Sequence, residues 1–309
     1  MQRDGSASVS RLAPAVVIGE ALVDVVDGIA IPGGSPLNVA VGLARLGLPT
    51  ALATRFGDDE YGRLIAEHLA ASGVSLTPGS VDSRPTGVAE ATIAADGSAS
   101  YRFAIDWDPA EVVIADAPAL VHTGSIGATL APGAALVERL LRDHRDAATI
   151  SYDPNARPQL MGDPADARVV VERLIGLADV VKASDEDVAW LYPDSDVDSV
   201  LAGWLAHGPA MVVLTRGGDG ADALAASGHV HVDAPATHVA DTIGAGDSFM
   251  AGLLAALADR DLLGGDRRDA LRGIDTATLT DVVSFAARCA AITVSREGAN
   301  PPSRDELAG

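Results

Sequence analysis

Cysteine is nearly absent from this chain, because Cys289 is the only one among 309 residues. A disulfide within the chain and a zinc centre built on several cysteines are therefore excluded. The single thiol lies in the apolar run 285–292, where we expect a buried, unreactive side chain. Aromatic residues are also few, at 4% of the composition, whereas 48% of the residues are hydrophobic. We therefore expect a globular core built from Ala, Val and Leu.

Long apolar runs are missing as well. We find no stretch that reaches the ~20 apolar residues of a membrane-spanning helix. The polar segment 1–14 also lacks the apolar stretch of a secretion signal. Together these features predict a cytoplasmic protein without a membrane partner.

Positive charge is scarce, since 22 Lys and Arg residues stand against 43 Asp and Glu, for a net charge of −21 at pH 7. Nucleic acid is therefore not an expected partner, because its phosphate backbone is bound by clustered Lys and Arg. The same negative field opposes a phosphate ligand at long range. A phosphate site in this chain must be made locally, from backbone N–H groups, a helix N-terminus and a divalent cation.

Two common phosphate-binding motifs are absent. Lys182 is the only lysine, and no glycine loop precedes it, so the chain has no P-loop. The dinucleotide fingerprint also fails, because Phe249 stands where its third small residue should be. A phosphate site in this chain would therefore need a sequence motif other than these two.

Short β-rich runs alternate with helical patterns along most of the chain. This rhythm is typical of βαβ units and predicts an α/β fold with a parallel sheet. We see no linker that would divide the chain, and we expect one domain over residues 1–309. The expected strands are 15–19, 50–54, 119–122, 148–152, 179–182, 211–215, 221–225 and 230–233, and the expected helices are 36–46, 60–71, 132–144, 164–177, 247–258 and 279–294.

One region departs from this rhythm. Residues 88–93 and 99–105 alternate around a turn at Ala95–Ser98, which predicts a β-hairpin. Together with the β-prone run 23–31, this hairpin could form a small sheet that stands off the main one. A small sheet at the carboxyl edge of an α/β sheet is well placed to act as a lid. We expect the lid to comprise about residues 23–32 and 86–106.

The segment Asp241–Ser248 (DTIGAGDS) leads directly into a helical pattern and is the strongest candidate for a chemical site. Gly244 and Gly246 allow the backbone around Ala245 to turn its N–H groups toward one point, where the helix dipole adds positive charge. We expect these three residues to form an anion hole. Asp247, in the first helical turn, could then accept a proton from an attacking hydroxyl. A glycine turn in which Asp247 acts only as an N-cap-type residue is the alternative.

A second candidate site is the segment Gly33–Ala40 (GGSPLNVA), which enters a predicted helix. Gly33 and Gly34 would let a hydroxylated ligand approach the backbone, and Asn38 offers both a donor and an acceptor to a diol. Asp24, after the first strand, could accept hydrogen bonds from neighbouring hydroxyls. A plain loop-to-helix entry and a solvated carboxylate are the alternatives for these two features.

The order of these motifs resembles that of the ribokinase-like (PfkB) carbohydrate kinases. Gly33–Asn38 is similar to the first signature of that family and Asp241–Asp247 to the second. Five further motifs follow in the family's order over nearly the whole chain: Gly57–Gly62 (GDDEYG), Asp153–Arg157 (DPNAR), Lys182–Asp187 (KASDED), Thr215–Gly220 (TRGGDG) and Gly298–Pro302 (GANPP).

The resemblance implies a central, mostly parallel sheet flanked by helices, a small β lid, and ATP-dependent phosphorylation of a sugar. It also implies roles for residues. Asp247 would be the base, and Gly244, Ala245 and Gly246 the anion hole. The sugar would be bound by Asp24, Gly33, Gly34, Asn38, Arg102, Asn155 and Arg157, and the nucleotide by Lys182, Ser184, Thr215, Gly217 and Gly220.

Metal ions are a further implication of the resemblance. The family usually organises Mg2+ with an Asn-x-x-Glu pattern, whereas the aligned residues here are Ser184–Asp187 (SDED). Mg2+ keeps several of its own waters, so Asp185, Glu186 or Asp187 could still act through water, with Asp187 as the first choice. An acidic first helical turn that complements the helix dipole is the alternative for Asp185 and Glu186. A monovalent cation, K+, is implied near Asp241, Ile243 and Gly298. His229 and His231 share a strand face, but with no third ligand nearby they do not predict zinc.

The acceptor is predicted less directly. Gly19–Asp24, Lys182–Asp187 and Gly298–Pro302 resemble the fructokinase branch most, which favours conversion of fructose to fructose 6-phosphate. The lid segment Tyr101–Asp108 departs from that branch. A 2-keto-3-deoxygluconate kinase is the alternative, because Arg157 or Arg102 could pair with a sugar acid.

A nucleoside kinase would need a platform for the base, and Trp107 is the one candidate. A catalytically silent sugar-binding member of the fold is the remaining reading, and a homodimer through the lid edges is a further expectation.

Overall fold

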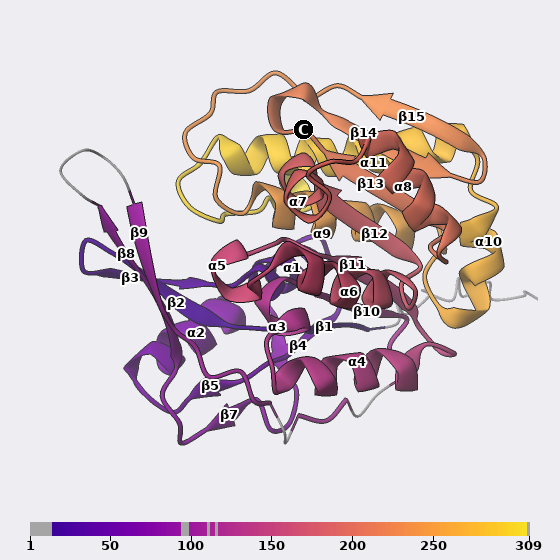
Figure 1. Cartoon of the computed structure of the whole chain (residues 1–309). Helices are drawn as coiled ribbons and strands as arrows, with labels where there is room; N and C mark the ends of the chain where they lie inside the picture. The colour runs from indigo at the N-terminus through magenta and orange to yellow at the C-terminus, as the bar shows by residue number, and fades with distance from the viewer. Residues whose placement is uncertain (1–13, 94–98, 110–111, 115–116, 308–309) are drawn as a thin grey trace, which may run out of the picture.

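The computed structural model describes residues 14–93, 99–109, 112–114 and 117–307. A large sheet forms its middle layer, and helices cover both faces (Figure 1). Alternation along β1 (Ala15–Ile18) explains the layers, because Val17 packs with the helices of one face while Val16 and Ile18 pack with those of the other. The α/β class predicted from the sequence is confirmed.

The large sheet has nine strands in the order β15-β14-β13-β12-β11-β10-β1-β4-β6. All neighbours from β13 to β6 are parallel, whereas β13–β14 and β14–β15 are antiparallel. The strands are β4 (Thr50–Ala53), β6 (Ser75–Leu76), β10 (Leu120–Gly124), β11 (Thr149–Asp153), β12 (Val180–Ser184), β13 (Met211–Thr215), β14 (Ala221–Ala225) and β15 (Gly228–Val232).

Helices from distant parts of the chain share each face. One face carries α1 (Ser35–Arg45), α2 (Glu60–Ala71), α9 (Ala245–Ala258), α10 (Arg268–Arg272) and α11 (Thr276–Val294). The other carries α4 (Gly133–His144), α6 (Pro164–Ile175), α7 (Asp185–Leu191) and α8 (Val197–Ala206). Two short helices, α3 (Ser125–Thr129) and α5 (Pro158–Met161), follow β10 and β11 at the edge where the strands end.

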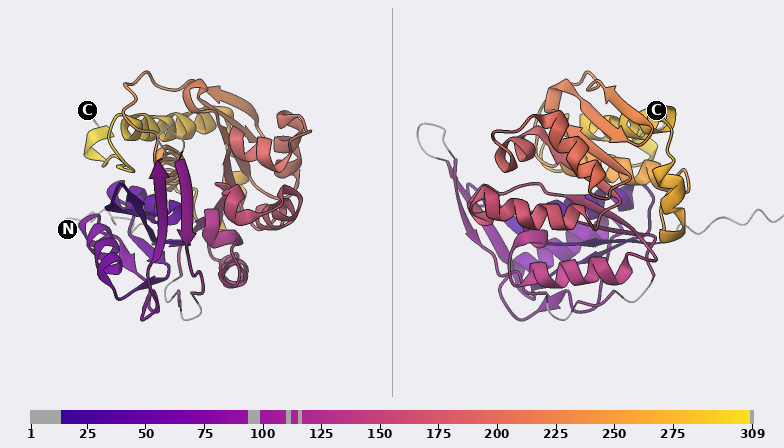
Figure 2. Two further views of the ribbon diagram at one scale, coloured as in Figure 1. Left: turned by 60° about the vertical axis from the view of Figure 1, so that its left-hand side comes forward. Right: turned by 45° about the vertical axis from the view of Figure 1, so that its right-hand side comes forward.

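A second sheet of four strands stands off one side of the molecule (Figure 2). Its order is β3-β2-β8-β9, with β2 (Leu22–Val26), β3 (Ile29–Gly33), β8 (Gly87–Ile93) and β9 (Ala99–Ala104). Because β2 begins four residues after β1 ends, this sheet lies at the carboxyl edge of the large one. A short pair, β5 (Phe56–Gly57) with β7 (Val81–Asp82), connects the region to α2. The predicted turn Ala95–Ser98 lies outside the described residues.

The run 23–31, expected as one β-prone segment, is in fact a hairpin. Asp27 and Gly28 have φ angles of 51° and 80°. Two successive positive φ values are typical of a two-residue hairpin turn, and the Asp-Gly pair is its usual sequence signal. The backbone therefore reverses at this point, and β2 and β3 pair antiparallel.

Helix α11 is long and apolar enough to cross a membrane, with a hydropathy of 1.4 over its best window. The core helix of a soluble protein can have the same length and the same mean hydropathy. In this fold α11 packs against α9 and buries Val283, Ala286 and Cys289 within the main core cluster. The expectation that Cys289 is buried is confirmed, and burial raises the pKa of its thiol to about 12. The segment 1–13 lies outside the described residues.

The packing of α1 against α9 depends on glycine. A Cβ atom added to Gly42 would lie 2.6 Å from the Cβ of Ala251 in α9. No real pair of Cβ atoms approaches so closely, so the two helices contact each other at the distance that a missing side chain permits. This contact matters because α1 and α9 carry the side chains of the candidate site.

We predict that Gly42→Ala lowers the free energy of unfolding by about 1–3 kcal/mol, because overpacking outweighs the gain in helix propensity. Gly203 in α8 is the matched control, since a Cβ there meets nothing within 4 Å. Gly203→Ala should raise the free energy of unfolding by up to about 1 kcal/mol. Urea denaturation measures both. Equal effects of the same sign would contradict the close packing of α1 on α9.

Candidate active site

The N-terminus of α9 is the centre of the candidate site. Gly244 precedes the helix with a φ of 74°, a left-handed conformation that favours glycine, and no side chain caps the helix there. A Cβ on Gly244 would also lie 2.6 Å from the Cβ of Ala299. The first N–H groups of a helix have no partner one turn back. With the helix dipole, these amides make a local positive site in a strongly acidic chain.

Asp247 lies in the first turn of α9 and is 6% exposed. Three side chains donate hydrogen bonds to its carboxylate. The Ser35 hydroxyl lies 2.6 Å from Oδ1, the Asn38 amide 2.8 Å from Oδ2, and the Asn155 amide 3.4 Å from Oδ1. All three donors come from segments at the carboxyl edge of the large sheet. The structure thus brings Asp247, Asn38 and Asn155 together, as the sequence motifs predict.

Asp24 lies beside the start of α1. A Cβ on Gly33 would lie 2.0 Å from the Asp24 Oδ2 atom, so only glycine leaves room for that carboxylate. Gly34, with a φ of 107°, turns the chain past the carbonyl oxygen of Glu20. Burial raises the pKa of Asp24, and the Arg157 charge lowers it. Asp24, Gly33 and Gly34 therefore lie together before α1, and the Asn38 N–H donates to the Gly34 carbonyl oxygen at 3.0 Å.

Glu20 is a buried carboxylate that the motifs did not single out. It is 2% exposed, and its Oε2 accepts the Gly127 N–H at 2.7 Å. Burial raises its pKa to about 7, although the hydrogen bonds and the Arg157 charge lower it. Glu20 thereby ties the junction of β1 and β2 to α3. The pattern Gly19–Asp24 contained this residue, but a strand-end glutamate has no signal of its own.

The loop after β11 presents Asn155 in a left-handed conformation, with a φ of 37°. The Arg157 guanidinium holds this loop, since its Nη1 donates to Asn155 O, Asn155 Oδ1 and Ala156 O at 2.9, 2.7 and 3.0 Å. The bond to Oδ1 orients the Asn155 amide so that its NH2 group faces Asp247. Arg102, by contrast, is exposed on β9 and lies opposite Glu90 in the register of the small sheet.

Lys182 is buried beneath α9. Its Nζ lies 2.7 Å from Asp153 Oδ2 and 3.4 Å from the Gly246 carbonyl oxygen. Burial raises the pKa of Asp153 to about 6, against the lowering effect of the Lys182 charge. Burial opposes the charge of Lys182 in turn, yet nearby carboxylates, Asp153 first, raise its pKa. This buried ion pair joins β11 and β12 to the first turn of α9.

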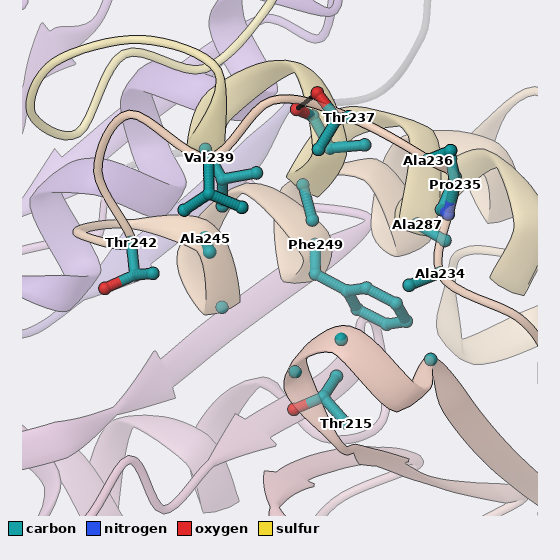
Figure 3. A pocket seen from close by; sticks show the side chains of 17 residues that line it. Thr215, Ala234, Pro235, Ala236, Thr237, Val239, Thr242, Ala245, Phe249 and Ala287 are labelled. Carbon is teal, nitrogen blue, oxygen red and sulfur yellow. Dashed lines mark hydrogen bonds between the residues drawn. The ribbon is translucent and has the colours of Figure 1, made fainter.

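An apolar cavity of about 440 Å³ lies on the other side of the α9 N-terminus (Figure 3). Figure 3 shows Phe249 of α9 and Thr215 of β13 on its walls. Of the predicted nucleotide residues, Thr215, Gly217 and Gly220 line it, whereas Lys182 and Ser184 do not. Its other lining residues include Ala234, Pro235, Ala236, Thr237 and Val239 from one loop and Ala287, Ala290, Ala291 and Val294 from α11. These loop and helix residues were missed because no sequence motif marks them.

The Ser184–Asp187 segment forms a capping box at the start of α7. Asp187 Oδ2 accepts the Ser184 N–H and hydroxyl, both at 2.8 Å. Its Oδ1 accepts the Ala156 N–H at 2.6 Å. Both oxygens of Asp187 therefore already accept hydrogen bonds from the protein. No group of three or more His, Cys, Asp or Glu side chains that could hold a metal ion occurs in the described part of the chain.

Asp241 connects the two loops for which a monovalent cation was predicted. Its Oδ1 accepts the Ile243 N–H at 3.0 Å and its Oδ2 the Gly298 N–H at 2.9 Å. These backbone hydrogen bonds lower the pKa of Asp241.

His229 and His231 lie on β15, where both rings contact Asp222 Oδ1, at 3.0 and 2.9 Å.

Comparison with known proteins agrees with this geometry. The family model described as pfkB family carbohydrate kinase matches residues 16–306. The protein is therefore a phosphotransferase that uses an alcohol group as acceptor. It belongs to the pfkB family of carbohydrate kinases, which confirms the resemblance found in the sequence.

Three relatives illustrate the similarity. A fructokinase of Rhizobium leguminosarum bv. trifolii is 36% identical over 261 residues, 79% of this chain and 80% of the relative. A solved double-mutant fructokinase from Vibrio cholerae O395, with fructose, ADP and potassium ion bound, superimposes with a TM-score of 0.78 at 26% identity, covering 96% of this chain and 98% of that one. Aminoimidazole riboside kinase from Salmonella enterica gives a TM-score of 0.77 at 26% identity, with the same coverage.

We predict that Lys182→Met lowers the free energy of unfolding by about 3–5 kcal/mol at neutral pH, because it leaves Asp153 buried without its partner. The deficit should be smaller at about pH 5 than at about pH 8. The sign follows from the raised pKa of Asp153: a folded-state pKa above the unfolded value contributes stability at low pH that is lost as the pH rises. Denaturation at both pH values measures this.

The control is the double variant Asp153→Asn, Lys182→Met, which buries no charge. It should lose less stability than Lys182→Met alone and show little difference between the two pH values. A pH-independent deficit in Lys182→Met would contradict the ion pair.

Proposed function

We propose that this carbohydrate kinase transfers the γ-phosphate of ATP to the 6-hydroxyl of fructose, giving fructose 6-phosphate. Asp247 takes the proton of the hydroxyl, and the amides of Gly244, Ala245 and Gly246 stabilise the charge on the transferred group. One observation carries the proposal. The N-terminus of α9 separates an apolar cavity from a polar cluster, and Ala245 and Gly246 line the cavity while the Asp247 side chain contacts the cluster.

The apolar cavity suits the base and ribose of ATP. Its walls are made largely of Ala, Gly, Val and Phe residues, and such an apolar surface favours binding of a flat aromatic ring. Thr215, Gly217 and Gly220 stand at the end of the cavity formed by β13 and the loop after it. The γ-phosphate would then reach the amides at the start of α9, as anions do at helix N-termini. Of these, the Ala245 N–H also donates to the Thr242 carbonyl oxygen, at 3.3 Å.

The polar cluster suits a neutral sugar. Asp24 and Asn38 offer acceptors and donors to neighbouring hydroxyls, with Gly33 and Gly34 leaving room for the ring. Arg157 is already engaged with Asn155 and Ala156, and its charge also acts on Glu20 and Asp24. These bonds occupy Nη1 alone, so the guanidinium keeps donors for the carboxylate of a sugar acid. The fructokinase relatives favour fructose over 2-keto-3-deoxygluconate.

A nucleoside acceptor is less favoured. Trp107 is 2% exposed, and its indole N–H donates to the Gly127 carbonyl at 2.8 Å. The ring is therefore part of the core rather than a platform for a base. Arg102 remains proposed as a sugar contact from β9, should the small sheet close over the site.

Cations are proposed in two places. Mg2+ would enter with the ATP phosphates and be steadied through water by Asp187, whose oxygens are otherwise engaged. When bound, it neutralises phosphate charge that the acidic chain cannot. K+ would lie beside Asp241, Ile243 and Gly298, with backbone carbonyl groups as its ligands. Lys182 and Ser184 support the phosphate end from beneath rather than from the cavity wall.

The four-stranded sheet is proposed as a lid on a single domain. Closure would exclude water, so that hydrolysis does not compete with transfer. Ile29 and Ile31 on its edge strand β3 are 64% and 48% exposed. Exposed apolar residues on an unpaired edge favour pairing of two subunits through their lids.

Dependence on ATP favours the cytoplasm as the place of action.

Acceptor identity is tested by ADP release in a coupled assay with fructose, ribose, 2-keto-3-deoxygluconate and adenosine. We predict the highest kcat/KM with fructose. A higher value with the sugar acid would replace fructose by the second candidate. No ADP release with any acceptor would indicate a catalytically silent member of the fold.

We predict that Asp247→Asn lowers kcat by about 10²–10⁴-fold, because an amide cannot accept the proton. Fructose and ATP binding should remain, since the side chain keeps its size. Asp259→Asn is the matched control, because Asp259 lies at the other end of α9 and pairs with Arg304 on the surface. Near-normal turnover in Asp247→Asn would rule out its role as the base.

A further inference from the structure

The hydroxyl group of Ser35 makes the shortest of the three contacts to Asp247, at 2.6 Å. Ser35 is the first residue of α1 and is 5% exposed. A hydroxyl has one proton to donate, and an ionised carboxylate can only accept. In the sugar-free site the Ser35 proton therefore points at the carboxylate that is proposed as the base. The motif that contains Ser35 was interpreted above only through its glycines and Asn38.

The two oxygens of Asp247 are in different surroundings. Oδ1 receives Ser35 and, more weakly at 3.4 Å, Asn155. Oδ2 receives Asn38 alone, at 2.8 Å. Oδ2 thus has a single donor, Asn38, which is itself a proposed sugar contact, and it has more capacity left to accept the proton of a sugar hydroxyl. Oδ1 already has two donors.

We infer that Ser35 is a positioning residue for phosphoryl transfer: its hydroxyl anchors Oδ1 of Asp247 and fixes the orientation of the carboxylate, so that Oδ2 accepts the proton of the sugar hydroxyl. This inference rests on the proposed role of Asp247 as base. A reacting group that is held in the productive geometry reacts faster than one that must first be oriented. A charge-assisted bond of this length is among the stronger ones in proteins.

Charged groups from several elements lie near the same turn. From β11 and β12, Asp153 and Lys182 face it as a buried pair. Asp187 on α7 acts on both members of that pair. The loop after β11 brings the neutral amide of Asn155, whose Oδ1 accepts from the Arg157 guanidinium at 2.7 Å, and α1 brings the neutral groups of Ser35 and Asn38. Removing the Ser35 hydroxyl thus changes one hydrogen bond and no formal charge.

The test is the separate measurement of kcat and of the KM for fructose at saturating ATP, because loss of positioning lowers kcat whereas loss of a sugar contact raises KM. In Ser35→Ala we expect kcat to fall by about tenfold, since a hydrogen bond that orients the charged base is lost. The KM for fructose should change by less than about twofold, because Ser35 contacts the base. Ser35→Thr, which keeps the hydroxyl, should keep kcat within about twofold of the wild-type value.

Ser248→Ala is the matched control. Ser248 follows Asp247, is 2% exposed, and its hydroxyl bonds to Thr293 at 2.7 Å instead of to Asp247. This variant loses a buried hydroxyl from the same turn and should leave kcat within about twofold of the wild-type value. An unchanged kcat in Ser35→Ala, or an equal fall in Ser248→Ala, would overturn the inference.

Two further variants keep the test decisive. Should Ser35→Ala fail to fold, Ser35→Cys replaces a strong donor by a weak one, and its kcat should fall by less. Asp247→Asn separates the inference from the function on which it rests. Near-normal turnover in Asp247→Asn overturns the proposed function itself, whereas an inactive Asp247→Asn with an unchanged kcat in Ser35→Ala overturns only the role of Ser35.

Discussion

The structure depends on one arrangement of charge, a carboxylate beside the backbone amides at the start of a helix. The chain carries a net charge of −21, so nothing in its overall field attracts a nucleotide. The first turn of α9, which no side chain caps, supplies positive potential locally. Asp247 stands in that same turn, held by neutral donors. The site can therefore stabilise an anion and still contain a base.

Several parts of the fold exist to keep that turn in place. Gly42 lets α1 approach α9, so that Ser35 and Asn38 reach Asp247. The Lys182–Asp153 pair holds the turn from beneath, at the carboxyl ends of two central strands. A buried pair of this kind is costly to break, which makes it a rigid support. Rigid support is what positioning of a reacting group within a fraction of an ångström requires.

The sequence was sufficient for the fold class, the helices near α1, α2 and α9, and the meeting of Asn38, Asn155 and Asp247. These predictions succeeded because glycine motifs and apolar periodicity are local signals. The Asp27–Gly28 turn was also a local signal, and the β2–β3 hairpin could have been read from it. The Ser35 contact could not, because its partner lies 212 residues away and only the packing of α1 on α9 brings the two together.

The partner of Lys182 could not be predicted from the sequence either. The family resemblance implied a nucleotide contact for Lys182, and the parallel register of β11 and β12 places its side chain against Asp153. The apolar cavity was missed for a related reason. Its wall is made by the irregular loop 234–239 and by small residues of α11, whose spacing in sequence is that of any core helix.

The most direct test of the account is a crystal structure of the protein with fructose and a non-hydrolysable ATP analogue. The account predicts the 6-hydroxyl of the sugar within hydrogen-bond distance of Asp247 Oδ2, the terminal phosphate on the amides at the start of α9, and the adenine in the apolar cavity. A sugar bound with no hydroxyl near Asp247, or phosphates turned away from α9, would contradict it.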